Sequence, residues 1–277
     1  LTRWSNGRIV STTSGLAQSA KPSVSDTASS PKELPPAKPV GLEAPGLPIK
    51  AHALIIGNAN YPGSARLANP INDALGMERK LLELGFSVTR ILDADRETLI
   101  RGLSQFQKSA ADSQITLLYY SGHGMQIDGV NFIVPVNIDL RQGASLKLQG
   151  VAMDTVIETY LAGSTKLVFL DACRDNPAIS SGLRGLGRGL APIQAPTGTL
   201  IAYATRDGGV AEDGTGKHSP YTQALLDLID KPEDISLMLR RVRDRVMKET
   251  SGRQQPWEYG SLSGGELVLS RLKGDTR

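Results

Sequence analysis

A lone cysteine and a histidine between two glycines are the residues of this chain most suited to chemistry. Cys173 is the only cysteine, and it follows an apolar run, 166–170, that predicts a buried strand. His123 follows a second run of this kind, 115–120, and Cys173 comes 50 positions after it. A thiol becomes an effective nucleophile when an acid/base group stands beside it. The pattern therefore predicts a cysteine nucleophile with a histidine partner.

Each of these two residues also has an unreactive interpretation. A free cysteine is often a small buried hydrophobe, and a loop histidine can be held by local hydrogen bonds alone. Charged residues surround the cysteine, namely Asp171, Arg174 and Asp175. Charged neighbours and Gly-His-Gly are poor core material, so both observations favour a reactive pair.

Composition places few other limits on function. The chain has 277 residues, 40% of them hydrophobic and 21% charged, with a net charge of +3, as in ordinary globular proteins. Without a long Lys/Arg run, and with 5% aromatic residues, nothing supports nucleic-acid binding. No apolar run approaches the roughly 20 residues that span a bilayer, so no transmembrane segment is predicted. One cysteine excludes a disulfide framework.

The chain divides into two parts by composition. Residues 1–50 are rich in Ser, Thr, Ala and Pro, and such a segment buries too little apolar surface to offset its chain entropy. We predict a disordered linker or pro-segment there and a folded domain over 51–271. The chain begins at Leu1, and the sequence leaves open what precedes it.

Strand and helix patterns alternate through the second part, which predicts a mainly parallel sheet covered on both faces. Catalytic sites in such sheets lie beyond the carboxyl ends of the strands, where both His123 and Cys173 are expected. Asn69 is the expected N-cap of the first helix. The expected strands are 51–56, 86–92, 115–120, 131–134, 166–170, 199–205 and 266–269, and the expected helices are 70–84, 95–111, 153–161, 220–228 and 235–247.

Two motifs carry a family resemblance. Tyr-Tyr-Ser-Gly-His-Gly at 119–124 and Asp-Ala-Cys-Arg-Asp-Asn-Pro at 171–177 resemble the caspase-like cysteine peptidases of clan CD, and most of all the bacterial metacaspases or orthocaspases. The 50-residue spacing also occurs between the His and Cys of caspases. Further similar segments follow in the family's order, so the resemblance covers about 51–270; they are 53–58, 67–74, 202–205, 219–226 and 255–258.

The resemblance implies a fold and a catalytic set. The fold is a caspase-like three-layer α/β/α sandwich, with a large-subunit-like part at about 51–180, a processing loop at about 180–195 and a small-subunit-like part at about 196–271. It implies that Cys173 is the nucleophile and His123 the acid/base. The backbone N–H groups of Gly124 and Cys173 match the family's oxyanion hole. Glycine on both sides of His123 would let the backbone approach a substrate closely.

The resemblance also implies a substrate pocket for a basic side chain. Asp73, Asp171 and Ser121 match pocket positions of the metacaspase-like members, and Tyr203 belongs to the matched small-subunit-like segment beside the pocket wall. Two carboxylates repel unless a cation lies between them, and a guanidinium suits that place. Asp73 could instead favour a helix dipole, and Asp171 could be bonded to local amides. Arg206 is expected to face solvent; pointing inward, it would weaken the case for basic-residue specificity.

A glycine-rich basic segment, 180–190, follows the cysteine and resembles an inter-subunit processing loop. We therefore predict self-cleavage after Arg184 or Arg188. Some metacaspases use calcium, and three loop acids could contribute here: Asp139, Asp175 and Asp213. They form no compact loop of alternating acids, so we expect them to be solvated and predict no metal or cofactor.

The remaining histidines, His52 and His218, have no partners at ligand spacing, and we expect them at the surface or an edge. The prediction is a cysteine endopeptidase that acts on polypeptides after Arg or Lys. Two alternatives stay open: a regulatory or scaffolding module, although an inactive relative would be expected to lack His or Cys, and a peptidase with Asp specificity. The resemblance is compatible with a periplasmic or secreted location and with a cytoplasmic one, so the compartment is not predicted. Oligomeric state, physiological substrate and activation trigger are not predicted.

Overall fold

A computed structural model describes residues 49–138, 147–173, 190, 193, 195–207 and 209–273. The segment predicted to be a disordered linker therefore lies almost wholly outside the described residues. Within them, no helix is long and apolar enough to cross a membrane.

Among the described residues, eight strands form one sheet in the order β2-β1-β3-β6-β7-β8, with β4 and β5 attached beyond β3. The strands β2, β1, β3, β6 and β7 run parallel, and β8 is antiparallel to β7. The bounds are β1 (Ala51–Gly57), β2 (Ser87–Leu92), β3 (Ile115–Ile127), β4 (Val130–Ile133), β5 (Val151–Ala152), β6 (Thr165–Cys173), β7 (Thr199–Tyr203) and β8 (Trp257–Gly260).

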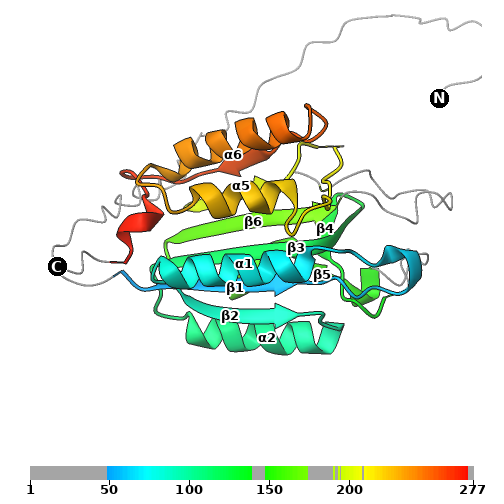
Figure 1. Ribbon diagram of the computed structural model, residues 1–277. Coiled ribbons are helices and arrows are strands. Elements are labelled where there is room, and N and C mark those ends of the chain that lie inside the picture. Colours follow the sequence, from blue (N-terminus) through cyan, green and yellow to red (C-terminus); the bar gives the residue numbers. More distant parts are fainter. Residues whose placement is uncertain are drawn as a thin grey trace, which may run out of the picture. The chain divides into compact units, whose positions relative to one another are not determined.

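Helices cover both faces of this sheet. Three lie across the face seen in Figure 1: α1 (Pro70–Glu83), α5 (Pro220–Leu228) and α6 (Ile235–Glu249). The other face packs against α2 (Arg96–Ser109), α4 (Met153–Thr155) and the π-turn η2 (Val156–Tyr160). Two short 3-10 turns are η1 (Gly63–Ala65) and η4 (Leu269–Arg271).

Strand alternation explains the two cores. Alternate residues of a strand face opposite sides, and in β1 Ala53 and Ile55 pack toward α1, whereas Leu54 and Ile56 pack toward α2. Every residue of β1 is buried, as in a strand covered on both faces. The predicted α/β/α sandwich with a mainly parallel sheet is confirmed.

Helix starts were predicted well where a side chain caps the helix. The Asp95 carboxylate accepts the Thr98 N–H at the start of α2, and the Ser219 hydroxyl accepts the Thr222 N–H at the start of α5. Asn69 occupies the predicted N-cap position of α1, but its side chain makes no cap bond and instead donates to the backbone carbonyl of Asp213. A tertiary partner therefore displaces the local cap.

Two strand predictions need correction. The expected strand at 266–269 is wrong. The Leu267 N–H donates to the Asp234 carboxylate and the Leu267 carbonyl accepts the Ile235 N–H, so its backbone bonds the start of α6 and not a neighbouring strand. The edge strand is β8 instead. The strand before His123 also does not end at residue 120. It continues to Ile127, pairing with β6 and then β4, so His123 lies within β3.

Candidate active site

The strand register brings the predicted catalytic residues together. In the parallel pair β3 and β6, His123 is the register partner of Cys173, and Ser121 is the partner of Asp171. Neighbouring strands lie roughly 4.8 Å apart. One row of this ladder thus pairs the histidine with the cysteine, and the row two residues earlier pairs the serine with the acid.

The His123 ring is held in one tautomer. Its Nε2 lies 2.7 Å from the carbonyl oxygen of Ala65 in η1, and a carbonyl can only accept, so Nε2 must carry the hydrogen. The lone pair of the neutral ring is then on Nδ1, which is buried and makes no hydrogen bond to any described group. His123 therefore presents a basic nitrogen with no competing donor.

Burial lowers the pKa of His123, while the Ala65 carbonyl and the Asp213 carboxylate act in the opposite direction. The ring is therefore neutral near pH 7 and able to accept a proton. The ring of Tyr61 lies against it, with centroids 4.4 Å apart. Tyr61 was missed in the sequence, because nothing in its local pattern shows which loop packs on β3.

A narrow recess of about 10 Å³, which is room for roughly one water molecule, opens beside Ser121 and Asp171. Its walls come from the loop before α1, from β3 and β6, and from the loop before α5. The lining residues are Leu67, Pro70, Ser121, Gly122, Asp171, Glu212, Asp213 and Ser219.

Asp171 is the buried acid of this recess. It is 6% exposed, and its carboxylate accepts hydrogen bonds from Thr222 Oγ1 at 2.6 Å and from the Ser219 hydroxyl. Burial raises the pKa of Asp171 to about 6, although the two hydroxyl groups lower it. No arginine or lysine of the described chain forms an ion pair with it.

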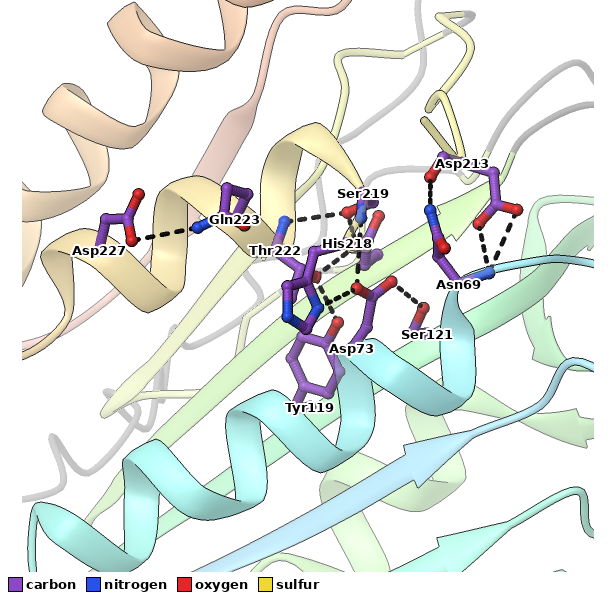
Figure 2. Close-up of polar contacts among 11 residues, drawn as sticks. Asn69, Asp73, Tyr119, Ser121, Asp213, His218, Ser219, Thr222, Gln223 and Asp227 are labelled. Carbon is purple, nitrogen blue, oxygen red and sulfur yellow. Dashed lines mark hydrogen bonds and ion pairs between the residues drawn. The ribbon is translucent and has the colours of Figure 1, made fainter. Parts of the chain in front are cut away.

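Asp73 lies behind the recess rather than in its wall. It is 0% exposed, and Figure 2 shows its carboxylate accepting from His218 Nδ1 at 2.9 Å, the Ser219 N–H at 3.2 Å and Ser121 Oγ at 3.4 Å. Burial and, next, the Asp171 charge raise the pKa of Asp73 to about 9. Asp73 thus reaches the recess only through Ser121 and Ser219.

The structure corrects the expectation for both remaining histidines. His52 is buried, with its Nε2 3.0 Å from Thr89 Oγ1. The His218 side chain is only 8% exposed and bonds Asp73. Gly76 in α1 makes room for it, because a Cβ at Gly76 would lie 2.9 Å from His218 Cε1. A glycine inside a helix is unfavourable. Gly76 was therefore the one residue in the sequence that could have indicated a close contact with α1 at this point.

The expectation that Asp213 is a solvated loop acid is also wrong. Its carboxylate accepts the Ala68 N–H at 2.7 Å. It also accepts the Asn69 N–H at 3.3 Å, a contact drawn in Figure 2 that joins the loop before α5 to the loop before α1. Asp139 and Asp175 lie outside the described residues. Across the described chain, no group of three or more His, Cys, Asp or Glu residues is arranged to hold a metal ion.

Comparison with known proteins adds the decisive observation. The family model described as the caspase domain (Peptidase_C14) matches residues 50–264. The chain belongs to the caspase-domain family. The family is one of cysteine peptidases, and the match covers every catalytic and pocket residue considered above.

Curated relatives and a solved structure agree with this membership. The chain is 34% identical over 236 residues to human mucosa-associated lymphoid tissue lymphoma translocation protein 1, and 32% identical to its mouse homologue. These alignments cover 80% of this chain but 27% of each relative, so the chain spans about a quarter of their length. The crystal structure of caspase-1 from Spodoptera frugiperda shares the fold, with a TM-score of 0.60 and 19% identity over 84% of this chain and 96% of that one.

Other predicted residues of the caspase domain lie elsewhere or outside the described part. Tyr203 is buried in the core on the α2 side, and its hydroxyl accepts the Ile193 N–H at 3.2 Å, so it does not line the recess. Arg206 is exposed, as expected. Gly124 is packed closely enough that a Cβ would lie 2.9 Å from Ala172 Cβ. Arg184 and Arg188 lie outside the described residues.

Proposed function

We propose that this caspase domain is a cysteine endopeptidase that hydrolyses peptide bonds after arginine or lysine. The observation that carries the proposal is the double row on β3 and β6. One row pairs His123 with Cys173, and the row two residues earlier holds Asp171 in a recess whose described lining residues include no arginine or lysine. In this proposal, nucleophilic attack occurs at the first row and recognition of the basic side chain occurs at the second.

The reaction follows acyl-transfer chemistry. The Cys173 thiol gives its proton to His123 Nδ1, and the thiolate sulfur attacks the carbonyl carbon of the peptide. The resulting oxyanion is held by the N–H groups of Gly124 and Cys173. His123 then protonates the leaving amine, the C–N bond breaks, and a thioester remains. Water, deprotonated by His123, hydrolyses the thioester and restores the thiol.

Electrostatics of the recess support a cationic substrate. Both Asp73 and Asp171 have pKa values raised by burial, so the empty recess disfavours their charged forms. A guanidinium or ammonium at Asp171 would favour the carboxylate and bring its pKa down. Arginine adds bidentate geometry to the charge. An aspartate side chain would meet carboxylates and be repelled.

Fluorogenic peptides ending in Arg, Lys or Asp test this proposal directly. We expect cleavage of the Arg and Lys peptides by the wild type, loss of cleavage in Cys173→Ala, and no cleavage of the Asp peptide. Parallel reactions with calcium and with a chelator test the proposal that no metal is needed. Cleavage of the Asp peptide alone would overturn the specificity, and inactivity toward all peptides would favour a regulatory module.

Self-processing is a further part of the proposal. Arg184 and Arg188 lie in the glycine-rich segment after Cys173, and both satisfy the proposed specificity. Intact mass after incubation should show cleavage after one of them in the wild type but not in Cys173→Ala. A single full-length species in active wild-type protein would exclude self-processing.

A further inference from the structure

The main chain of His123 lies where β3 loses one of its neighbours. Strand β1 pairs with β3 as far as Gly57 and Ser121, and the last bond on this side runs from the Asn58 N–H to the Ser121 carbonyl at 2.9 Å. In a strand, the N–H and C=O of alternate residues point to the same side. The next residue that faces the departed β1 is therefore His123, whose buried backbone groups need other partners.

Two tyrosine hydroxyls supply those partners. The His123 N–H donates to Tyr61 Oη at 3.1 Å, and the Tyr120 hydroxyl donates to the His123 carbonyl. The Tyr61 hydroxyl in turn donates to the Val134 carbonyl at 3.0 Å, so it acts as acceptor and donor at once. All of these groups are buried, and buried hydrogen bonds of this kind hold geometry strongly.

The two tyrosine hydroxyls leave no room for a side chain at Gly122. A Cβ at Gly122 would lie 2.8 Å from Tyr120 Oη and 3.0 Å from Tyr61 Oη, so any side chain there would displace the hydroxyls. Its φ of +153° also lies in the region that favours glycine. The glycine before His123 is therefore required by the two tyrosines, whatever its role toward substrate.

The loop that carries Tyr61 also sets the ring. Ala65, in the same loop, accepts from His123 Nε2, and the Tyr61 ring lies against the imidazole. Asp93 anchors the start of this loop, where its carboxylate accepts the N–H groups of Ala59 at 2.8 Å and Asn60 at 2.9 Å. Backbone and ring of His123 are thus oriented by one loop and one residue of its own strand.

We propose that Tyr61 and Tyr120 are positioning residues, whose hydroxyls replace the missing strand and aim His123 Nδ1 at the Cys173 row. The inference rests on the proposed function. Neither tyrosine touches the substrate in this account; both act through His123. Removing either hydroxyl should therefore lower the rate of the chemical step without changing how substrate binds.

Tyr61→Phe and Tyr120→Phe test the inference, with Tyr221→Phe as the matched control. Tyr221 is also fully buried, but its hydroxyl bonds the Ala202 carbonyl at 3.4 Å, away from His123. With an Arg peptide, we expect kcat to decrease by roughly tenfold in each test variant, since small misplacements of a catalytic group have large effects. KM should stay within about twofold, and the control should match the wild type. Thermal unfolding of each variant establishes that it is folded.

Alkylation of the protein by iodoacetamide supplies a second measurement that needs no substrate. Because Cys173 is the only cysteine, the rate near pH 7 reports its thiolate alone. We expect Tyr61→Phe to slow alkylation in the wild type but not in a His123→Ala background, since a residue that acts through His123 has no further effect once the imidazole is gone.

The outcomes separate the inference from the proposed function. If His123→Ala abolishes peptide cleavage while folded Tyr61→Phe and Tyr120→Phe keep the wild-type kcat, the positioning role is overturned and the function stands. An equal slowing of alkylation by Tyr61→Phe in both backgrounds also overturns it, because the hydroxyl would then act through the fold. If His123→Ala leaves peptide cleavage unchanged, the proposed function is wrong, and the positioning role that depends on it is wrong as well.

Discussion

The surroundings of His123 and of Ser121, two residues apart on β3, shift the pKa values of their ionisable groups in opposite directions. Around His123, the described partners are neutral hydroxyls and a carbonyl, and burial lowers the pKa of the imidazole. Around Ser121, the described partners are buried acids, and burial raises the pKa of Asp73 and Asp171. Burial favours the neutral form in both regions. In the proposed function, the first region accepts a proton and the second binds a cation.

We expect changes around His123 to alter kcat and changes around the recess to alter recognition of the substrate. The substitution His123→Ala should have the largest effect. Without the acid/base group, we expect kcat toward an Arg peptide to decrease by about 10²–10⁴-fold. KM should change little, because His123 is not part of the recess. Steady-state kinetics measure both constants, and a change confined to KM would contradict the division.

Asp171→Asn should come next and act on recognition. Truncating one partner of a buried charge pair costs about 2–5 kcal/mol, or roughly 30-fold and more in kcat/KM for Arg peptides. Asp213→Asn is the matched control, because Asp213 lines the recess but also accepts two backbone N–H groups. We expect the control to have the smaller effect. Equal losses of kcat/KM in the two variants would show that recognition depends on the total negative charge of the recess and not on Asp171 in particular.

The pH dependence of stability should reveal the buried acids in the empty enzyme. Because the pKa of Asp73 is raised to about 9, the folded state holds its proton more tightly than the unfolded chain. The contribution of Asp73 to stability is therefore full below its unfolded pKa of about 4 and is lost as pH rises toward the folded pKa near 9. We expect the thermal midpoint of the wild type to decrease over this range.

Asp73→Asn provides the comparison for that measurement. The amide oxygen can accept from His218 and Ser219 as the Asp73 carboxyl does. The amide nitrogen would lie near Ser121, whose hydroxyl can accept a hydrogen bond as well as donate one. Its midpoint should therefore depend less on pH and exceed that of the wild type at high pH, by roughly 2–4 °C for each kcal/mol. Parallel slopes for the two proteins would mean that Asp73 is ionised in the folded state.

His218 should have the smallest effect of this series. His218→Ala removes the Nδ1–H donor to Asp73, and we expect KM for Arg peptides to rise by roughly fivefold or less, in line with one lost hydrogen bond. His218→Asn offers an amide donor at a similar position and should restore most of the affinity. A loss in kcat instead of KM would move His218 to the catalytic side of the comparison.

The sequence predicted the part of the site that depends on strand order. Apolar runs before His123 and Cys173 identify parallel strands, and the register then makes the two residues partners. Likewise, Asp95 and Ser219 are local caps and could be identified without tertiary information.

What the sequence could not predict depends on packing between distant segments. The contact of His218 with Asp73 requires α5 to lie beside α1, and the contact of Tyr61 with His123 requires one particular loop to cover β3. Asn69 is the N-cap residue of α1, but the sequence gives no sign that its side chain bonds Asp213, which is far away in the chain. In each case, a polar side chain preferred a distant partner that no local pattern shows.

One labelling experiment tests the central claim most directly. Chloromethyl ketones ending in Arg or Asp lose chloride to a cysteine nucleophile that has bound their side chain, and intact mass counts the adducts. We predict one adduct on the wild type with the Arg reagent, none on Cys173→Ala and none with the Asp reagent. Labelling by the Asp reagent, or equal labelling of Cys173→Ala, would contradict the account.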